Sequence, residues 1–307
     1  MHIDHFKVFC DLAETQSFSK AADLNGITQS AVSQRVRQME EKFGATLVER
    51  GHRNFALTPE GIAMLEAARE VLAIYNDLGS RLQTIRNEVS GDLRVASIFS
   101  IGLHELPPLL KGFQARHPDV RVRVDFRRSQ QVYLEVQSGE VDVGLVAYPA
   151  KRTGLAFEVF EEDDMVLIVH PNHPFAGAGS IPLNQLNGQR FISFEPDTPT
   201  RKVIDRYLRE NGVTPVHVME FDNVETVKRA VEVESGISIV PENTVRQEVE
   251  TGQLAAVRLE GQRLTRPLGI VYQRNRPRFP ALAEFIDALR SGARHHNEAA
   301  SKPTSAD

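Results

Sequence analysis

The sequence predicts an α/β protein that begins with a winged helix-turn-helix, continues through a long linker helix and ends in a two-lobed α/β domain. Two short amphipathic patterns meet at Asn25-Gly26, apolar residues follow a heptad spacing after residue 58, and strand and helix patterns alternate from Asp92. A chain of 307 residues is too long for one ordinary core, so two or three folding units are expected.

Composition and charge indicate a globular protein without a disulfide framework or a membrane span. Cys10 is the only cysteine, and no apolar run approaches the roughly 18 to 20 residues that cross a bilayer. The first residues lack a basic segment followed by an apolar core, so a cytoplasmic location is expected. The formal charge of -5 argues mildly against nucleic acid as a partner, but the distribution of basic residues decides that question.

The first 44 residues predict three helices, of which the last two form a helix-turn-helix. Ser17 or Ser19 caps the second helix, and Gly26 supplies the positive φ that ends it. Thr28 caps the third helix, which Gly44 ends. The polar outer face of this helix carries Gln29, Ser30, Ser33, Gln34, Arg37 and Gln38. Such a face suits the major groove of DNA, whereas the alternative is a polar surface helix of a helical bundle.

The residues after Gly44 favour the DNA-binding interpretation. Leu47-Val48 and residues 55–57 predict two short strands around a basic turn that carries Arg50, His52 and Arg53. A cationic hairpin beside a helix-turn-helix is a wing, suited to phosphates and the minor groove.

Residues 58–89 predict a long helix that begins with a capping Thr58, Pro59 and the acidic Glu60. Its apolar residues alternate in steps of four and three, and they are Met64, Ala68, Val71, Tyr75, Leu78, Leu82, Ile85 and Val89. This narrow seam favours a dimerising coiled coil over the core helix of a globular domain.

The N-terminal segment resembles the LysR-type transcriptional regulators. The motifs that carry the resemblance are FxxxxxxxSFSKAA (Phe9 and residues 17–22), QSAVSQRVRQMEEKFG (29–44), LVER (47–50) and LTPEG (57–61). Ser30 stands where the family usually has Pro, and Val48 stands where it usually has Phe; neither change disturbs the fold. The resemblance implies base contacts from Gln29, Ser33 and Gln34, and contacts to the backbone or minor groove from Arg37, Arg50 and Arg53.

From Asp92 the chain predicts strands alternating with helices, first as βαβαβ and then as a second α/β unit. The last strand and helix are expected to rejoin the first unit, so that the chain crosses twice between two lobes. The motifs HP (117–118), GEVDVGL (139–145), HPNHP (170–174) and GISIVP (236–241) resemble the LysR effector domain, which is similar to periplasmic solute-binding proteins. The resemblance covers residues 2–291.

The expected domains are 1–58, 59–89 and 90–292, with lobe I at 91–162 and 267–292, lobe II at 163–266, and a disordered tail at 293–307.

Ligands of open α/β sheets bind beyond the carboxyl ends of strands, where this sequence places polar residues at predicted helix starts. The candidate effector-binding residues are Ser100, Ile101, Ser129, Thr198, Thr200, Arg201 and Asn223. Converging helix N-termini with hydroxyl groups favour a small anion, and Arg201 strengthens this prediction if its side chain turns inward. The alternative for each residue is plain helix capping. Family members bind effectors at positions matching Ser100, Ser129 and Thr200, so the resemblance favours these three.

Other classes of protein fit the sequence less well. It contains no GxSxG, P-loop or GxGxxG motif, so no enzyme and no cofactor are expected. His170 and His173 stand beside prolines and are not expected to bind a metal, and His295 and His296 lie in the tail. A redox sensor needs cysteines that the effector part lacks. A transport-type binding protein and an effector-independent regulator remain as alternatives.

The sequence is therefore interpreted as a sequence-specific transcriptional regulator controlled by a small-molecule effector. A homodimer through residues 58–89 is expected to read an inverted repeat in double-stranded DNA. The resemblance implies a homotetramer through the effector domains, and RNA polymerase is a candidate partner. No membrane partner is expected.

Overall fold

The computed structural model describes residues 2–49, 55–86, 89–276 and 278–300. The chain divides into two compact units, which are described separately: one ends with α4 and the other begins at β1. The predicted wing residues Arg50, His52 and Arg53 lie outside the described residues.

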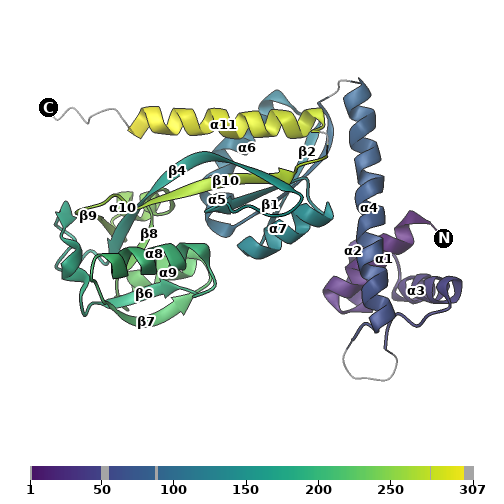
Figure 1. The fold of residues 1–307 in the computed structure, drawn as a ribbon, viewed down its shortest axis with the longest axis horizontal. Helices are drawn as coiled ribbons and strands as arrows, with labels where there is room; N and C mark the ends of the chain where they lie inside the picture. The colour runs from purple at the N-terminus through teal and green to yellow at the C-terminus, as the bar shows by residue number, and fades with distance from the viewer. Residues whose placement is uncertain (1, 50–54, 87–88, 277, 301–307) are drawn as a thin grey trace. The chain divides into compact units, whose positions relative to one another are not determined.

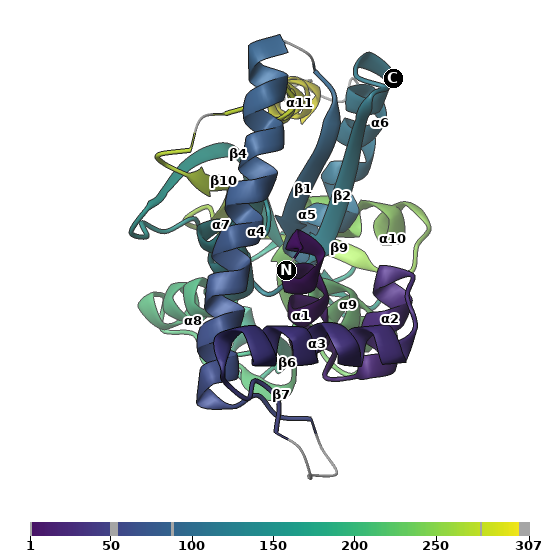
Figure 2. The same cartoon turned by 90° about the vertical axis from the view of Figure 1, so that its right-hand side faces the viewer.

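The N-terminal unit contains the predicted helix-turn-helix in α1 (Ile3–Thr15), α2 (Phe18–Asn25) and α3 (Gln29–Phe43), shown in Figure 2. Ser17 caps α2 by accepting the Lys20 N–H at 3.4 Å, and Gly26 ends it with φ of 62°. Thr28 caps α3 by accepting the Ala31 N–H at 3.2 Å. The shared core lies on the inner faces of these helices and is made by Val8, Phe9, Leu12, Ala21, Ala22, Val32, Val36, Met39, Leu47 and Val48. Leu24 of α2 and Phe43 of α3 are apolar but exposed, and they lie outside this core.

An antiparallel bridge between Val48 and Leu57 joins the two sides of the predicted wing. Glu40 accepts the Leu47 N–H at 2.9 Å, so this carboxylate of α3 fixes the chain that enters the wing. Gly61 follows the Thr58 cap, and a Cβ there would lie 2.1 Å from the Leu47 carbonyl oxygen. The LTPEG motif thus needs a glycine because the wing backbone passes against the start of α4.

The long helix α4 runs from Pro59 to Arg86 (Figure 1). Ala68 of the predicted seam is fully buried within the unit, whereas further along the helix Val71, Tyr75, Leu78, Leu82 and Ile85 are exposed. Val89, placed in this helix by the sequence, lies beyond its end and packs on the core of the second unit.

The second unit is the predicted two-lobed α/β domain, and its largest sheet has the order β2-β1-β3-β10-β4-β9-β5. The first three strands, β1 (Gly91–Ser97), β2 (Val120–Phe126) and β3 (Val143–Ala147), are parallel, as βαβαβ connections require. Their helices are α5 (Phe99–His104), α6 (Leu106–Arg116) and α7 (Ser129–Ser138). The sequence predicted a single helix where α5 and α6 stand. That helix breaks at Glu105, just before Pro107 and Pro108, because proline fits the first turn of a new helix and not a helix interior.

Two antiparallel strands, β4 (Leu155–Val169) and β10 (Thr265–Gln273), carry the chain between the lobes (Figure 1). β4 pairs with β10 up to Asp164, and from Met165 it pairs with β8 (Ser238–Pro241) and then β9 (Ala255–Leu259). The pairing of β4 with β10 is interrupted by a bulge beside Leu268. We call the first lobe, which contains β1–β3, lobe I, and residues 165–264 lobe II.

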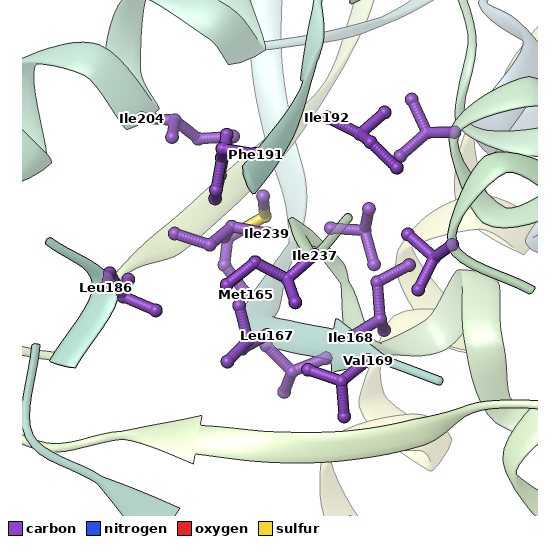
Figure 3. Packing of buried hydrophobic residues seen from close by; sticks show 14 of the residues in the cluster. Met165, Leu167, Ile168, Val169, Leu186, Phe191, Ile192, Ile204, Ile237 and Ile239 are labelled. Atoms are coloured by element: carbon purple, nitrogen blue, oxygen red, sulfur yellow. The ribbon is translucent and has the colours of Figure 1, made fainter. Parts of the chain in front are cut away.

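Lobe II is built around β8 and the parallel pair β6 (Arg190–Phe194) and β7 (Val216–Phe221). Its helices are α8 (Pro199–Glu210), α9 (Val224–Glu232) and α10 (Arg246–Glu250), and its short elements are β5 (Ser180–Ile181), η1 (Leu183–Leu186) and η2 (Glu242–Val245). Figure 3 shows its core, where Leu167 and Val169 of β4 pack near Ile237 and Ile239. Each lobe has a core of its own, so the lobes are joined mainly through β4 and β10.

The chain closes with α11 (Pro280–Ala300), whose N-terminal part packs on lobe I through Phe285 and Ile286. The sequence analysis expected a disordered tail from residue 293, but the helix continues to Ala300. Residues 293–300 contain no proline or glycine and are rich in alanine, which favours helix. Within the described residues, no helix has the length and apolarity to cross a bilayer.

Candidate functional site

The outer face of α3 presents the side chains that the sequence assigned to DNA. Gln29, Ser30, Gln34 and Arg37 are exposed, and Ser33 is half-buried. The face is held by the packing of Val32, Val36 and Met39, which are at most 4% exposed on the opposite side. The α3 backbone therefore presents these polar groups together, at helical spacing, toward solvent.

The arginines of α3 have no carboxylate partner among the residues that the structure describes. Within the described residues, neither Arg35 nor Arg37 forms an ion pair, whereas the nearby Glu40 is turned toward the Leu47 N–H. Unpaired guanidinium groups beside amide and hydroxyl groups can bind phosphates and base edges at the same time.

A cavity of about 340 Å³ lies between lobe I and lobe II of the second unit. Its wall includes five of the seven predicted effector residues, and they are Ser100, Ser129, Thr198, Thr200 and Asn223. They come from α5, α7, α8 and the start of α9, at the carboxyl ends of β1, β2, β6 and β7. The topology therefore brings together residues that are more than 120 positions apart.

The hydroxyl and amide side chains in this wall differ in their hydrogen-bond partners. Thr198 accepts the Arg201 N–H at 3.2 Å, and Asn223 accepts the Thr226 N–H at 3.1 Å, so both are helix caps as the alternative interpretation held. Within the described residues, the hydroxyls of Ser129 and Thr200 have no hydrogen-bond partner. These two groups, at the starts of α7 and α8, can donate to a bound anion.

Two predicted effector residues lie outside the cavity wall. Ile101 is fully buried in the core of lobe I. The Arg201 guanidinium turns away, because it donates to Asp205 at 2.8 Å, to Glu220 at 2.9 Å and to the Phe194 carbonyl at 2.7 Å. Arg201 thus fixes α8 against β6 and β7, and the condition under which it would strengthen the anion prediction, an inward-facing side chain, is not met.

Five cationic side chains line the cavity instead: Arg127, Arg128, Arg152, Lys202 and Arg266. Three of them are already paired. Arg127 binds Glu135 at 2.5 Å, and Arg266 binds Asp163 at 2.5 Å. Arg128 of lobe I reaches three carboxylates of lobe II, with Glu195 at 3.0 Å, Asp222 at 3.4 Å and Asp197 at 3.8 Å.

Arg152 and Lys202 have no carboxylate partner within the described residues, and they approach the cavity from opposite lobes. The Arg152 guanidinium lies 5.3 Å from the centre of the Tyr133 ring, whose hydroxyl accepts the Ala150 N–H at 2.8 Å. This contact positions Arg152, since a cation over an aromatic face is attracted to it. Lys202 lies in the first turn of α8, which contains no acidic residue.

Neither residue could be predicted from the sequence, because an isolated Arg or Lys in a loop or a first turn carries no motif. Lys202 did leave a signal, since a cation near a helix N-terminus opposes the helix dipole unless an anion lies in front of it. The two acidic residues of the wall, Asp197 and Asp222, are both held by Arg128. Arg152 and Lys202 are thus the two cations of the wall that contact no carboxylate in the described part of the chain.

Arg266 forms the base of the cavity. It is 2% exposed, donates to the Ser100 hydroxyl at 2.8 Å and binds Asp163 across the β4–β10 pair. Because Ser100 accepts from Arg266, its own O–H remains available to an anion in the cavity.

Cys10, His170 and His173, the other residues that the sequence raised as possible functional groups, lie in environments that explain them as structural residues. Burial raises the pKa of the Cys10 thiol to about 12, so it stays protonated within the first unit. His170 lies in the turn after β4 and pairs with Glu234 at 3.0 Å, while His173 accepts the Phe175 N–H at 3.2 Å. No group of three or more potential metal ligands occurs in the described part of the chain.

Comparison with known proteins agrees with this geometry. Residues 3–62 match the bacterial regulatory helix-turn-helix protein of the lysR family, and residues 86–294 match the LysR substrate binding domain. The chain is 30% identical to the RuBisCO operon transcriptional regulator of Allochromatium vinosum, over 96% of this chain and 99% of that one.

Two solved structures share the fold. Full-length CbnR complexed with its target DNA has a TM-score of 0.72 at 22% identity, over 95% of this chain and all of that one. The regulatory domain of Synechocystis PCC6803 CcmR in complex with 2-PG has a TM-score of 0.61 at 24% identity, over 66% of this chain and 97% of that one.

A helix-turn-helix with a free polar face, joined to a two-lobed domain with a cationic cavity, defines a ligand-responsive class of DNA-binding regulator. The chain belongs to the LysR family of transcriptional regulators.

Proposed function

We propose that this regulator binds a small effector with more than one negative charge in the cavity between its lobes. The observation that carries the proposal is that Arg152 and Lys202 line the cavity from opposite lobes and contact no carboxylate among the described residues. Ser100, Ser129 and Thr200 would supply hydrogen bonds to the effector, while Arg266 orients Ser100. The CcmR regulatory domain was solved with 2-PG, which makes 2-PG a reasonable first probe.

Effector binding is expected to stabilise a closed arrangement of the lobes. The lobes already touch through Arg128 with its three carboxylates and through His104 with Glu225 at 2.8 Å. A ligand that contacts both Arg152 and Lys202 favours the closed arrangement, because only that arrangement offers both contacts.

For DNA we propose that Gln29, Ser30, Ser33 and Gln34 face the major groove and that Arg37 binds the backbone. The wing residues Arg50, His52 and Arg53 keep the roles expected from the sequence. The exposed apolar residues of α4, from Val71 to Ile85, are proposed as a dimer contact, since an exposed seam at this spacing buries readily against its own copy. A homotetramer, RNA polymerase as a partner and a cytoplasmic location are further parts of this proposal.

The test is fluorescence anisotropy with DNA from upstream of the gene for this protein, against scrambled DNA, at about 50 and 200 mM salt. Tighter binding of the upstream DNA, altered by 2-PG, supports both halves of the proposal. Specific binding that no small anion changes favours the effector-independent alternative. Equal and weak binding to both DNAs contradicts the assignment of this upstream DNA as a target.

A further inference from the structure

The junction between the lobes contains a cluster of acidic side chains that neither the DNA-binding face nor the effector contacts use. Glu105 lies between α5 and α6 and is 8% exposed. Glu161 and Asp163 lie on β4, where they are 8% and 2% exposed. Among the described residues, Arg266 supplies the one guanidinium that is buried with them. We call Glu105, Glu161, Asp163 and Arg266 the hinge cluster, because β4 and β10 are the strands that connect the lobes.

The hydrogen bonds of the hinge cluster do not satisfy all three carboxylates. Asp163 accepts from Arg266 and from Asn243 of η2 at 2.8 Å. Glu105 retains a buried oxygen, Oε1, with no hydrogen-bond partner in the structure. Since an ionised carboxylate with an unsatisfied buried oxygen is costly, this oxygen indicates that the cluster holds a proton.

Charge balance leads to the same result. Three ionised carboxylates around one buried guanidinium would leave an excess of negative charge in a buried site, since Arg246, the other arginine that acts on the cluster, is exposed. The other groups that act on the cluster are Arg246 of α10, His104 of α5 and the Tyr148 phenol. Burial raises the pKa of Tyr148 to about 12, so this phenol remains neutral and supplies no charge.

The two glutamates are the groups that retain the proton. Burial, followed by the charges of Glu105 and Asp163, raises the pKa of Glu161 to about 8, against the lowering effect of Arg246 and Arg266. Burial, followed by the charge of Asp163, likewise raises the pKa of Glu105, while Arg266, a hydrogen bond from Asn243 and His104 lower it.

Arg266 connects this cluster to the effector cavity, since the same guanidinium binds Asp163 and the Ser100 hydroxyl. An anion bound at Ser100 adds negative charge on the other side of Arg266. We propose that the hinge cluster is a proton site coupled to the cavity, so that an anionic effector and a proton bind together. This inference rests on the proposed effector site and concerns its regulation by pH.

The first experiment needs no effector. Urea unfolding of the full-length protein is followed between about pH 5.5 and pH 9 for the wild type, Glu161→Gln and Glu105→Gln. The folded state keeps the proton up to about pH 8, whereas the unfolded chain releases it near pH 4.5. The wild type therefore loses stability relative to Glu161→Gln as the pH rises toward 8, and the difference is constant above that pH.

Glu162→Gln is the matched control, because Glu162 is the exposed neighbour of Glu161 on β4. Its difference from the wild type should not change with pH. If the differences for Glu161→Gln and Glu105→Gln are equally flat, the hinge cluster holds no proton in this range and the inference is overturned.

The second experiment measures coupling with 2-PG as the probe, by isothermal titration calorimetry in HEPES and Tris buffers. The titration covers about pH 7.5 to pH 9.5, where a phosphate group is already ionised and does not itself cause a change. The affinity for 2-PG should fall above pH 8, by at most about tenfold per pH unit. Binding should also be accompanied by proton uptake by the protein, and Glu161→Gln should abolish this uptake.

The outcomes of the second experiment separate this inference from the proposed function. Binding that is independent of pH and of buffer overturns the coupling and leaves the effector site intact. If 2-PG does not bind the wild type, 2-PG is not the effector, and the unfolding experiment alone decides whether the hinge cluster holds a proton.

Discussion

The arginines on the outer face of α3 and those in the wall of the cavity differ in whether they contact carboxylates. On α3, neither Arg35 nor Arg37 has an ion-pair partner within the described residues. In the cavity, Arg128 and Arg266 are each bound to carboxylates, and the shortest contact is 3.0 Å for Arg128 and 2.5 Å for Arg266.

Solvation explains this difference for Arg266, which is 2% exposed, but not for Arg128, which is exposed and still contacts carboxylates. A cation on an exposed helix keeps its water, and it is free to replace counterions on DNA at little cost. A guanidinium in a cleft loses water, so it needs a carboxylate unless a ligand supplies the negative charge. Arg152 and Lys202 are exposed, as Arg37 is, and what sets them apart is that they line the cavity from opposite lobes. The comparison can be tested by removing a paired cation, an unpaired cleft cation and an unpaired α3 cation.

Removing the paired cation should have the largest effect. Arg266→Ala leaves the buried Asp163 carboxylate without its guanidinium partner. This change should lower the free energy of unfolding by about 3 to 5 kcal/mol near neutral pH. Urea denaturation of the full-length protein measures this loss. Arg263→Ala breaks an exposed pair with Asp164 near the same strands and should cost less than about 1 kcal/mol.

A double variant tests whether the unpaired charge causes the loss. Replacing both partners, as Arg266→Met with Asp163→Leu, removes the buried charge and should recover much of the stability lost in Arg266→Ala. If the double variant is no more stable than Arg266→Ala, lost packing and not the stranded carboxylate explains the destabilisation.

Removing an unpaired cation of the cleft should leave stability unchanged and weaken the effector. Lys202→Ala is expected to reduce the affinity for 2-PG by roughly threefold to tenfold, since a charge-assisted contact at an exposed rim is partly screened. Arg206→Ala is the matched control, because Arg206 is exposed on the same helix and does not line the cavity. Calorimetry that finds equal affinities for both variants would remove Lys202 from the effector site.

The same contrast explains how far the sequence could predict each site. The face of α3 depends on local rules: a Thr28 cap, a Gly44 stop and helical spacing place Gln34 and Arg37 without reference to the rest of the chain. The cavity depends on contacts between distant segments. Strand ends correctly placed Ser129 and Thr200, since open sheets gather their carboxyl ends at one edge.

Side-chain direction was the part that sequence could not supply. Arg201 and Lys202 are neighbours at the start of α8, but only Lys202 lines the cavity. Arg201 is turned away by Asp205, one helical turn later, and by Glu220 on another strand. The first of these partners follows from i,i+4 spacing, whereas the second requires knowledge of the β6–β7 pairing.

The smallest effect is expected for Arg37 of α3. Arg37→Ala should weaken DNA binding severalfold on every sequence and reduce the slope of log affinity against log salt by about one unit, as loss of one phosphate contact does. Gln34→Ala sharpens the result, because a lost base contact should cost about 1 to 3 kcal/mol on the target and leave the salt slope unchanged. Anisotropy titrations at several salt concentrations separate the two. A salt slope unaltered in Arg37→Ala would show that this exposed cation does not bind phosphate. The contrast between unpaired arginines on α3 and paired arginines in the cavity would then have a cause other than DNA binding.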